Sequence, residues 1–170
     1  RFAREHAGGT VDEREVGAAV ASALAPFERA GAGEGAYQIQ HELQDTMQDL
    51  VGIVRREDEM RRALDTVHAL RTRAREVGVS GNREYNPGWH TALDLTHLLT
   101  VSEAITRSAI ERKESRGGHF RDDYPEKSPE FGGFNLVIRK GEGPQGAMQL
   151  ERVPVPPMPP ELTAIIEEMK

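Results

Sequence analysis

The sequence predicts a mostly α-helical protein, in which a bundle of three to four helices is followed by a short β-hairpin and a proline-rich tail. Apolar residues make up 37% of the 170 positions and aromatic residues only 5%, so the core must be mainly aliphatic, which suits helices better than a β-sandwich. Apolar positions recur at helical spacing before residue 125, whereas short β-type runs follow it. We therefore expect a helical bundle domain over residues 1–125, with the hairpin and tail over residues 126–170.

Composition also disfavours several classes of function. The formal charge of −6 provides no basic field for nucleic acid. Without cysteine the chain forms no disulfide, has no thiolate nucleophile and ligates no iron–sulfur cluster through cysteine. Since no apolar run approaches the roughly 18 to 20 residues of a membrane span, we expect no direct membrane insertion. The chain begins with Arg1 in a run typical of the end of a helix, so we expect a piece of a longer polypeptide.

Local signals predict the first three helices. Thr10 opens a capping-box pattern that begins a helix at about Val11 and ends it at Arg29, before a glycine-rich linker over residues 31–35. The second helix begins at Tyr37, and a third is expected over residues 58–77, with Gly78 as its left-handed cap. One apolar stripe defines the second helix: Ile39, Leu43, Met47, Leu50, Val51 and Val54.

The remaining elements follow in order. Asn86 and Pro87 supply a cap and a first-turn proline for a long helix that reaches about Glu114, and its apolar residues point in several directions. We expect this helix to be the central and most buried one. Two runs, over residues 134–139 and 148–153, predict the hairpin, and a short helix is expected over residues 161–169.

Two patterns resemble chemical sites but lack the context that such sites need. Residues 141–146 match GxGxxG, yet a strand-like run follows where a nucleotide site needs a helix, so a hairpin loop is the favoured interpretation. The helical histidines form no HExxH pair, and we expect no metal site. These histidines are His41, His68, His90 and His97.

The charged segment, residues 110–125, carries the most unusual chemistry. It leaves the long helix through Gly117 and Gly118, and four positive and four negative residues lie between Glu111 and Asp123. A pocket for an anion would show excess positive charge, whereas balanced signs favour an ion-pair network that fixes how the segment docks on another surface. Structural docking is therefore favoured, and direct ligand contact stays open as the alternative.

The run RKESRGGHFRDDYP in this segment resembles the signature of the C-terminal helical domain of succinate dehydrogenase and fumarate reductase flavoproteins. The matching residues include Ser115 and Gly117, with Gly118 where alanine is usual. Upstream, Met47 and the run from Val51 to Arg55 are similar to the second helix of the same family. The candidate docking residues in the signature are Arg112, Glu114, Arg116, His119, Arg121, Asp123 and Tyr124.

The resemblance implies a part of an FAD-dependent oxidoreductase of electron transport and the tricarboxylic acid cycle, which interconverts succinate and fumarate. The FAD-binding and substrate motifs of the family are absent from this sequence, so we expect no catalytic or cofactor-binding residue here, and FAD only in the full-length subunit. An isolated chain should fold but be colourless and inactive. We expect Arg116 and His119 to make contacts outside the bundle, towards the flavin domain.

The implied partners are the FAD-binding domain of the same subunit, an iron–sulfur subunit and a flavinylation or assembly factor. The implied location is cytoplasmic, peripheral on the inner face of the membrane through partner subunits. Two alternatives remain. One is the C-terminal domain of L-aspartate oxidase, in which the position of Arg121 is usually not arginine. The other is an independent helical protein-interaction module.

Overall fold

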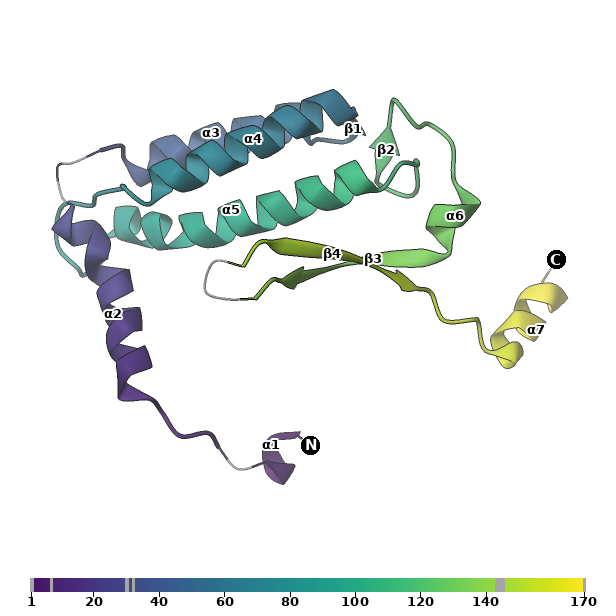
Figure 1. The fold of residues 1–170 in the computed structure, drawn as a ribbon, viewed down its shortest axis with the longest axis horizontal. Coiled ribbons are helices and arrows are strands. Elements are labelled where there is room, and N and C mark those ends of the chain that lie inside the picture. Colours follow the sequence, from purple (N-terminus) through teal and green to yellow (C-terminus); the bar gives the residue numbers. More distant parts are fainter. Residues whose placement is uncertain (1, 7, 30, 32, 143–145, 170) are drawn as a thin grey trace. The chain divides into compact units, whose positions relative to one another are not determined.

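The computed structural model describes residues 2–6, 8–29, 31, 33–142 and 146–169, and it confirms the mostly helical prediction (Figure 1). The helices are α1 (Phe2–Glu5), α2 (Glu13–Glu28), α3 (Ala36–Leu50), α4 (Glu57–Ala74), α5 (Pro87–Glu111), α6 (Pro129–Gly132) and α7 (Pro160–Glu168). The strands are β1 (Val54–Arg55), β2 (Phe120–Arg121), β3 (Phe134–Lys140) and β4 (Met148–Pro154).

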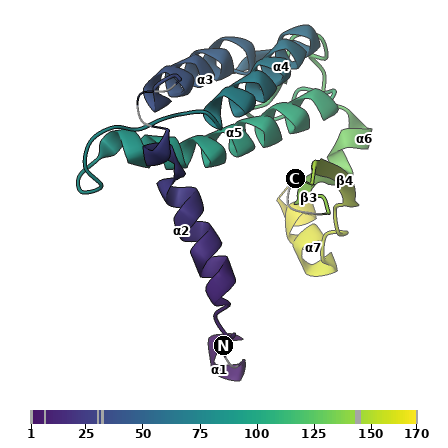
Figure 2. The same ribbon diagram turned by 60° about the vertical axis from the view of Figure 1, so that its left-hand side comes forward.

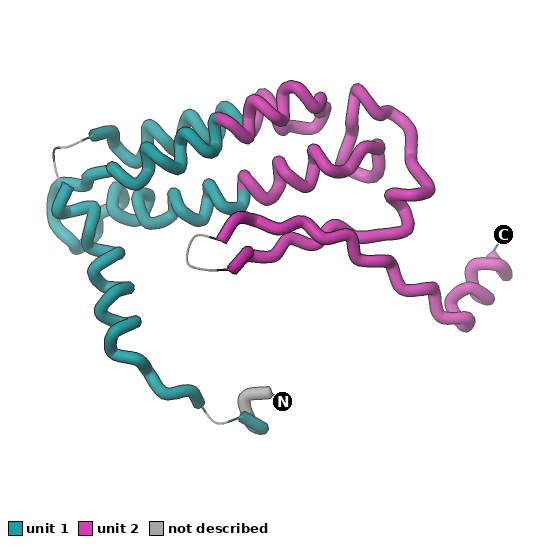
Figure 3. The backbone as a smooth tube through the Cα atoms, viewed as in Figure 1, with its two compact units in different colours: residues 1–46, 66–101 teal, residues 47–65, 102–170 magenta. Residues whose placement is uncertain are grey.

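The chain divides into two compact units (Figure 3). Unit 1 comprises residues 1–46 and 66–101, and unit 2 comprises residues 47–65 and 102–170. The predicted division into residues 1–125 and 126–170 stays a prediction. Among the described residues, no helix is both long enough and apolar enough to cross a lipid bilayer.

Unit 1 has an aliphatic core joined to α2 by one tryptophan. Trp89 Nε1 donates a hydrogen bond of 2.7 Å to the carbonyl of Ala23, and the Trp89 ring lies 5.3 Å from that of Phe27. The Trp89 amide in turn donates to Asn86 Oδ1 at 3.0 Å, which confirms Asn86 as the cap of α5. The side chains of this core include Ile39, Leu43, Val67, Leu70, Leu95 and Leu99.

Two predicted helix ends are wrong in unit 1. The cap of α2 is Asp12 rather than Thr10, because the Asp12 carboxylate accepts the amide of Arg14 at 2.8 Å. α4 ends at Ala74, and Gly78 is not its left-handed cap. The amides of residues 75–77 instead bond to carbonyls three residues earlier, so a tightened last turn ends the helix before Gly78 is reached.

One further expectation fails over residues 47–65. The helix predicted from Tyr37 ends at Leu50, and Val54 lies in β1. The chain turns tightly there, since a Cβ on Gly52 would stand 2.6 Å from the Gln48 carbonyl oxygen. Along α5, Leu95, Leu99 and Ala109 are buried, whereas Val101 is 56% exposed.

Unit 2 is built on a small core, a parallel strand pair and the hairpin. Val51, Met60, Ala63 and Ala109 form the buried cluster. Strands β1 and β2 pair in parallel, whereas β3 and β4 pair antiparallel over their whole length and confirm the hairpin. The predicted C-terminal helix is also present as α7, at the end of the proline-rich arm (Figure 2).

Candidate functional site

The charged segment turns through a tight two-glycine bend after α5. The backbones of Arg116 and His119 exchange hydrogen bonds of 2.8 and 3.1 Å, and Gly117 between them has a φ of +60°. Residues with a side chain rarely adopt a positive φ, which explains why glycine is needed at this position. The bend sends the chain directly into β2 beside β1, so the segment returns to unit 2 instead of leaving it.

Arg121 is the fully buried centre of the segment. Its Nη1 donates to the carbonyls of Ala109, Ile110 and Arg112 at 2.9, 3.3 and 3.3 Å. These belong to the end of α5, where helix carbonyls lack partners within the helix. A positive charge also stabilises the negative end of the helix dipole. Arg121 is therefore the C-terminal cap of α5, supplied from nine to twelve residues further along the chain.

Asp123 neutralises Arg121 and joins it to α4. Its two carboxylate oxygens accept from Nε and Nη2 of Arg121, both at 2.7 Å. The same carboxylate accepts the amide of Glu57, the first residue of α4, at 3.0 Å. The hydrogen bond from Arg121 is the main cause that lowers the pKa of Asp123 to about 2. One ion pair thus caps the end of α5 and the beginning of α4.

Glu114 is a second fully buried charge, shared by two arginines. Arg116 donates to it at 2.9 and 3.1 Å, and Arg112 donates at 2.6 Å. The amide of Ser128 adds a hydrogen bond of 2.8 Å. The bond from Arg116 outweighs the effect of burial and is the main cause that lowers the pKa of Glu114 to about 2. The carboxylate is therefore ionised in the folded protein at any neutral pH.

Arg112 extends this network to the hairpin. It donates to the carbonyls of Phe131 and Phe134 at 3.0 and 3.3 Å, and its guanidinium lies 5.8 Å from both rings. Tyr124 covers the other ion pair, with its ring 4.9 Å from the Arg121 guanidinium. The segment thus fixes α5, α4 and the start of β3 to one another within unit 2.

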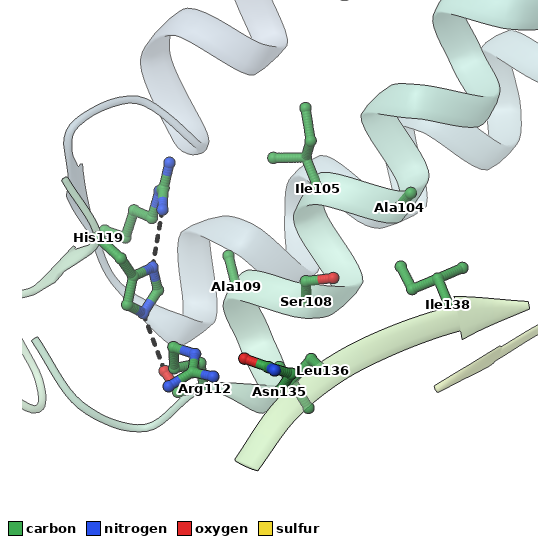
Figure 4. A pocket seen from close by; sticks show the side chains of 10 residues that line it. Ala104, Ile105, Ser108, Ala109, Arg112, His119, Asn135, Leu136 and Ile138 are labelled. Carbon is green, nitrogen blue, oxygen red and sulfur yellow. Dashed lines mark hydrogen bonds between the residues drawn. The ribbon is translucent and has the colours of Figure 1, made fainter. Parts of the chain in front are cut away.

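His119 is held in its neutral form by two contacts that Figure 4 draws. Its Nδ1 lies 2.7 Å from Nη1 of Arg55, and its Nε2 lies 3.0 Å from the carbonyl oxygen of Arg112. Because a guanidinium can only donate, Nδ1 must accept and Nε2 must carry the proton. Burial, followed by the surrounding arginine charges, lowers the pKa of His119. The imidazole therefore acts as an acceptor that positions Arg55.

The structure brings all seven predicted docking residues into one network of unit 2. Arg116 and His119 have the partners described above inside the chain, and their contacts outside it stay a prediction. Sequence reasoning missed the contributions of Glu57 and Ser128, which meet the segment only through the fold. Arg55 was visible as part of the family pattern, but no sequence signal placed it beside His119.

Two sequence patterns that resemble ligand sites can be compared with the structure. The GxGxxG match joins the antiparallel strands β3 and β4, so it lacks the helix that a dinucleotide site requires. Its residues 143–145 lie outside the described residues. Within the described part of the chain, no three histidine or acidic side chains are grouped to hold a metal. The contacts of the charged segment hold elements of unit 2 together.

The two glycines of the bend should respond differently to alanine. We expect Gly117→Ala to lower the free energy of unfolding by about 1 kcal/mol, because φ is positive there. Gly118→Ala is the matched control and should change it by less than about 0.5 kcal/mol, since a Cβ at Gly118 meets no atom within 4 Å. Urea unfolding of both variants measures the difference, and equal losses would contradict this account of the bend.

The two carboxylates with low pKa values predict acid sensitivity. Folding lowers both pKa values to about 2, from ordinary values of 4.5 for Glu114 and 3.8 for Asp123. Their stabilisation is therefore complete above about pH 5 and is lost as the pH falls towards 2. Denaturant unfolding across this range should show the decline.

Glu114→Gln provides the test of this assignment. It should cost about 3 kcal/mol at neutral pH, because two guanidiniums lose their shared carboxylate, and its acid decline should be shallower. Asp122→Asn is the control, since Asp122 forms an exposed pair with Arg56 at 3.0 Å, which is worth at most about 1 kcal/mol. An unchanged acid decline in Glu114→Gln would refute the role given to this carboxylate.

Residues 40–164 match the protein family described as fumarate reductase flavoprotein C-term. A curated relative, from the fumarate reductase (CoM/CoB) of Methanothermobacter marburgensis, is 34% identical over 105 residues, which are 62% of this chain and 19% of the relative. An L-aspartate oxidase from Vibrio cholerae is 38% identical over 100 residues, 59% of this chain and 18% of that enzyme.

A solved structure gives a longer match. Sdh1 of Mycobacterium smegmatis, in complex with UQ1, aligns with a TM-score of 0.86 and 42% sequence identity over 93% of this chain and 27% of that chain. The chain spans less than a fifth of the length of the curated relatives described above. The family match covers well over half of the chain and confirms the resemblance carried by the charged segment. The chain belongs to the fumarate reductase flavoprotein C-terminal family, the C-terminal domain of succinate dehydrogenase and fumarate reductase flavoprotein subunits.

Proposed function

We propose that this domain completes a flavoprotein subunit that interconverts succinate and fumarate by hydride transfer to FAD, and that it is not catalytic by itself. The observation that carries the proposal is the likeness to Sdh1, which extends over 93% of the chain at 42% identity. FAD belongs to the full-length subunit in this proposal. The domain would supply a rigid surface for the flavin-binding part.

The network of the charged segment supports this structural role. Glu114 and Asp123 are both occupied by arginines and backbone amides, so neither carboxylate is available as a general acid or base. An iron–sulfur subunit that receives the electrons, and a flavinylation or assembly factor, are the further partners we propose. Attachment to the inner face of the membrane would then come through partner subunits.

L-aspartate oxidase is the competing candidate. It is favoured by the 38% identity to the Vibrio cholerae enzyme, but that match covers 59% of the chain, whereas the Sdh1 match covers 93%. Arg121 is also unusual for L-aspartate oxidases according to the resemblance, and here it is the buried cap of α5. An independent interaction module is disfavoured by the family match.

The full-length subunit tests the proposed activity. We expect the purified protein to carry FAD, seen by visible absorbance, and to reduce an artificial electron acceptor with succinate but not with L-aspartate. The 170-residue chain purified alone should show no flavin absorbance. Oxidation of L-aspartate without oxidation of succinate would refute the proposal, and so would stoichiometric FAD on the isolated chain.

Arg116→Ala in the full-length subunit tests the docking role. Arg116 holds Glu114 and donates to the carbonyl of Ser128 at 3.1 Å, so its loss should loosen the segment and reduce assembly or flavin content. The FAD-to-protein ratio and the amount of assembled complex measure this effect. Normal FAD content with weakened substrate affinity alone would favour direct contact with the ligand instead.

A further inference from the structure

Arg55 differs from the other arginines around the charged segment. Arg112 and Arg116 share Glu114, Arg121 pairs with Asp123, and Arg56 pairs with Asp122, each at 3.0 Å or less. Arg55 has no carboxylate within ion-pairing distance among the described residues. Its side chain is half-buried, which makes an unpaired positive charge costly.

The contacts of Arg55 fix the orientation of its guanidinium but do not neutralise its positive charge. Its Nε donates to the carbonyls of Val51 and Gly52 at 3.1 and 2.8 Å, and its Nη1 donates to the neutral His119. None of these partners carries a negative charge. Nη2 has no hydrogen-bond partner in the described part of the chain. Three acceptors thus position the guanidinium, and the N–H groups of Nη2 remain available to donate to an external anion.

Arg55 lines a groove of about 520 Å³ in unit 2, and Figure 4 draws the side chains that line it. Its lining includes the basic side chains of Arg55, Arg112 and His119, and the apolar side chains of Ile105 from α5 and of Leu136 and Ile138 from β3. No aspartate or glutamate lines the groove. Its surface therefore combines one available cation with apolar contacts on two elements.

The available charge favours a single carboxylate over a free dicarboxylate. Arg112 lines the same groove, but its Nη1 and Nη2 already donate to Glu114 and to the carbonyls of Phe131 and Phe134. A small dicarboxylate would need cations at both ends, and among the described residues that line the groove only Arg55 has a cationic group free to supply one. An acidic side chain on a polypeptide, with an apolar neighbour against the apolar lining, matches both properties of the groove.

We propose that this groove binds an extended segment from the flavin-binding part of the same subunit, with an Asp or Glu side chain of that segment paired to Arg55. This inference rests on the proposed function, since it takes the occupant from the longer polypeptide. The chain spans 27% of the solved Sdh1 chain that it matches, so most of such a subunit lies outside these residues. His119 is the positioning residue for Arg55.

Zero-length cross-linking in the full-length subunit tests the pairing. Arg55→Lys places an amine near the groove, and a water-soluble carbodiimide should join it to a carboxylate of the flavin-binding part, identified by mass spectrometry. Arg56→Lys is the matched control, and its amine should link to Asp122 or Asp58, the present partners of Arg56. A link from Arg55→Lys only to residues within 1–170, or to another subunit, would overturn the proposal.

A second probe does not depend on the reach or folding of the lysine variant. A photoreactive phenylalanine analogue at Ile105, which is 44% exposed, should cross-link to the same segment of the flavin-binding part. The proposal is wrong if neither probe links to the flavin-binding part. It is also wrong if inorganic phosphate or succinate abolishes both links while the subunit stays folded and assembled, because the groove would then bind a small anion. The rate of succinate oxidation is measured on the same preparations. Succinate oxidation without the expected links would refute the groove proposal but not the proposed function.

Discussion

The buried guanidinium of Arg121 is the interaction on which the rest of unit 2 depends. It satisfies three carbonyls at the end of α5 and binds Asp123, which in turn caps the start of α4. A buried cation is tolerated only with such complete pairing. Because both helix ends share one ion pair, the geometry of the charged segment and the packing of the helices cannot vary independently.

The features that were predicted correctly from sequence have local causes. Asn86 caps α5 through an amide three residues away, and the hairpin follows from two short runs with a turn between them. The errors arise where tertiary contacts decide. Val54 continues an apolar helical stripe in the sequence, but it is drawn into a strand whose partner is Phe120. Helical spacing contains no information about that distant strand.

The family pattern in the sequence identified the candidate site, whereas the contacts of its side chains became known only from the structure. Within the charged segment the charges balance, which favoured an ion-pair network, and Glu114 and Asp123 form that network. In the folded chain, Arg55 from β1 lies beside His119, so positive charges exceed negative ones among the residues that line the groove. Counting charges over a sequence window could not include a residue that is 64 positions from His119.

The parallel pairing of β1 with β2 has a consequence for the order of folding. Contacts such as that between Glu57 and Asp123 close a loop across 66 positions, so chain entropy opposes them until the helices within the loop have formed. During synthesis, β1, α4 and the whole of α5 leave the ribosome before Arg121 does. The end of α5 and the start of α4 therefore stay uncapped in the nascent chain, and this region becomes rigid only when the charged segment has emerged.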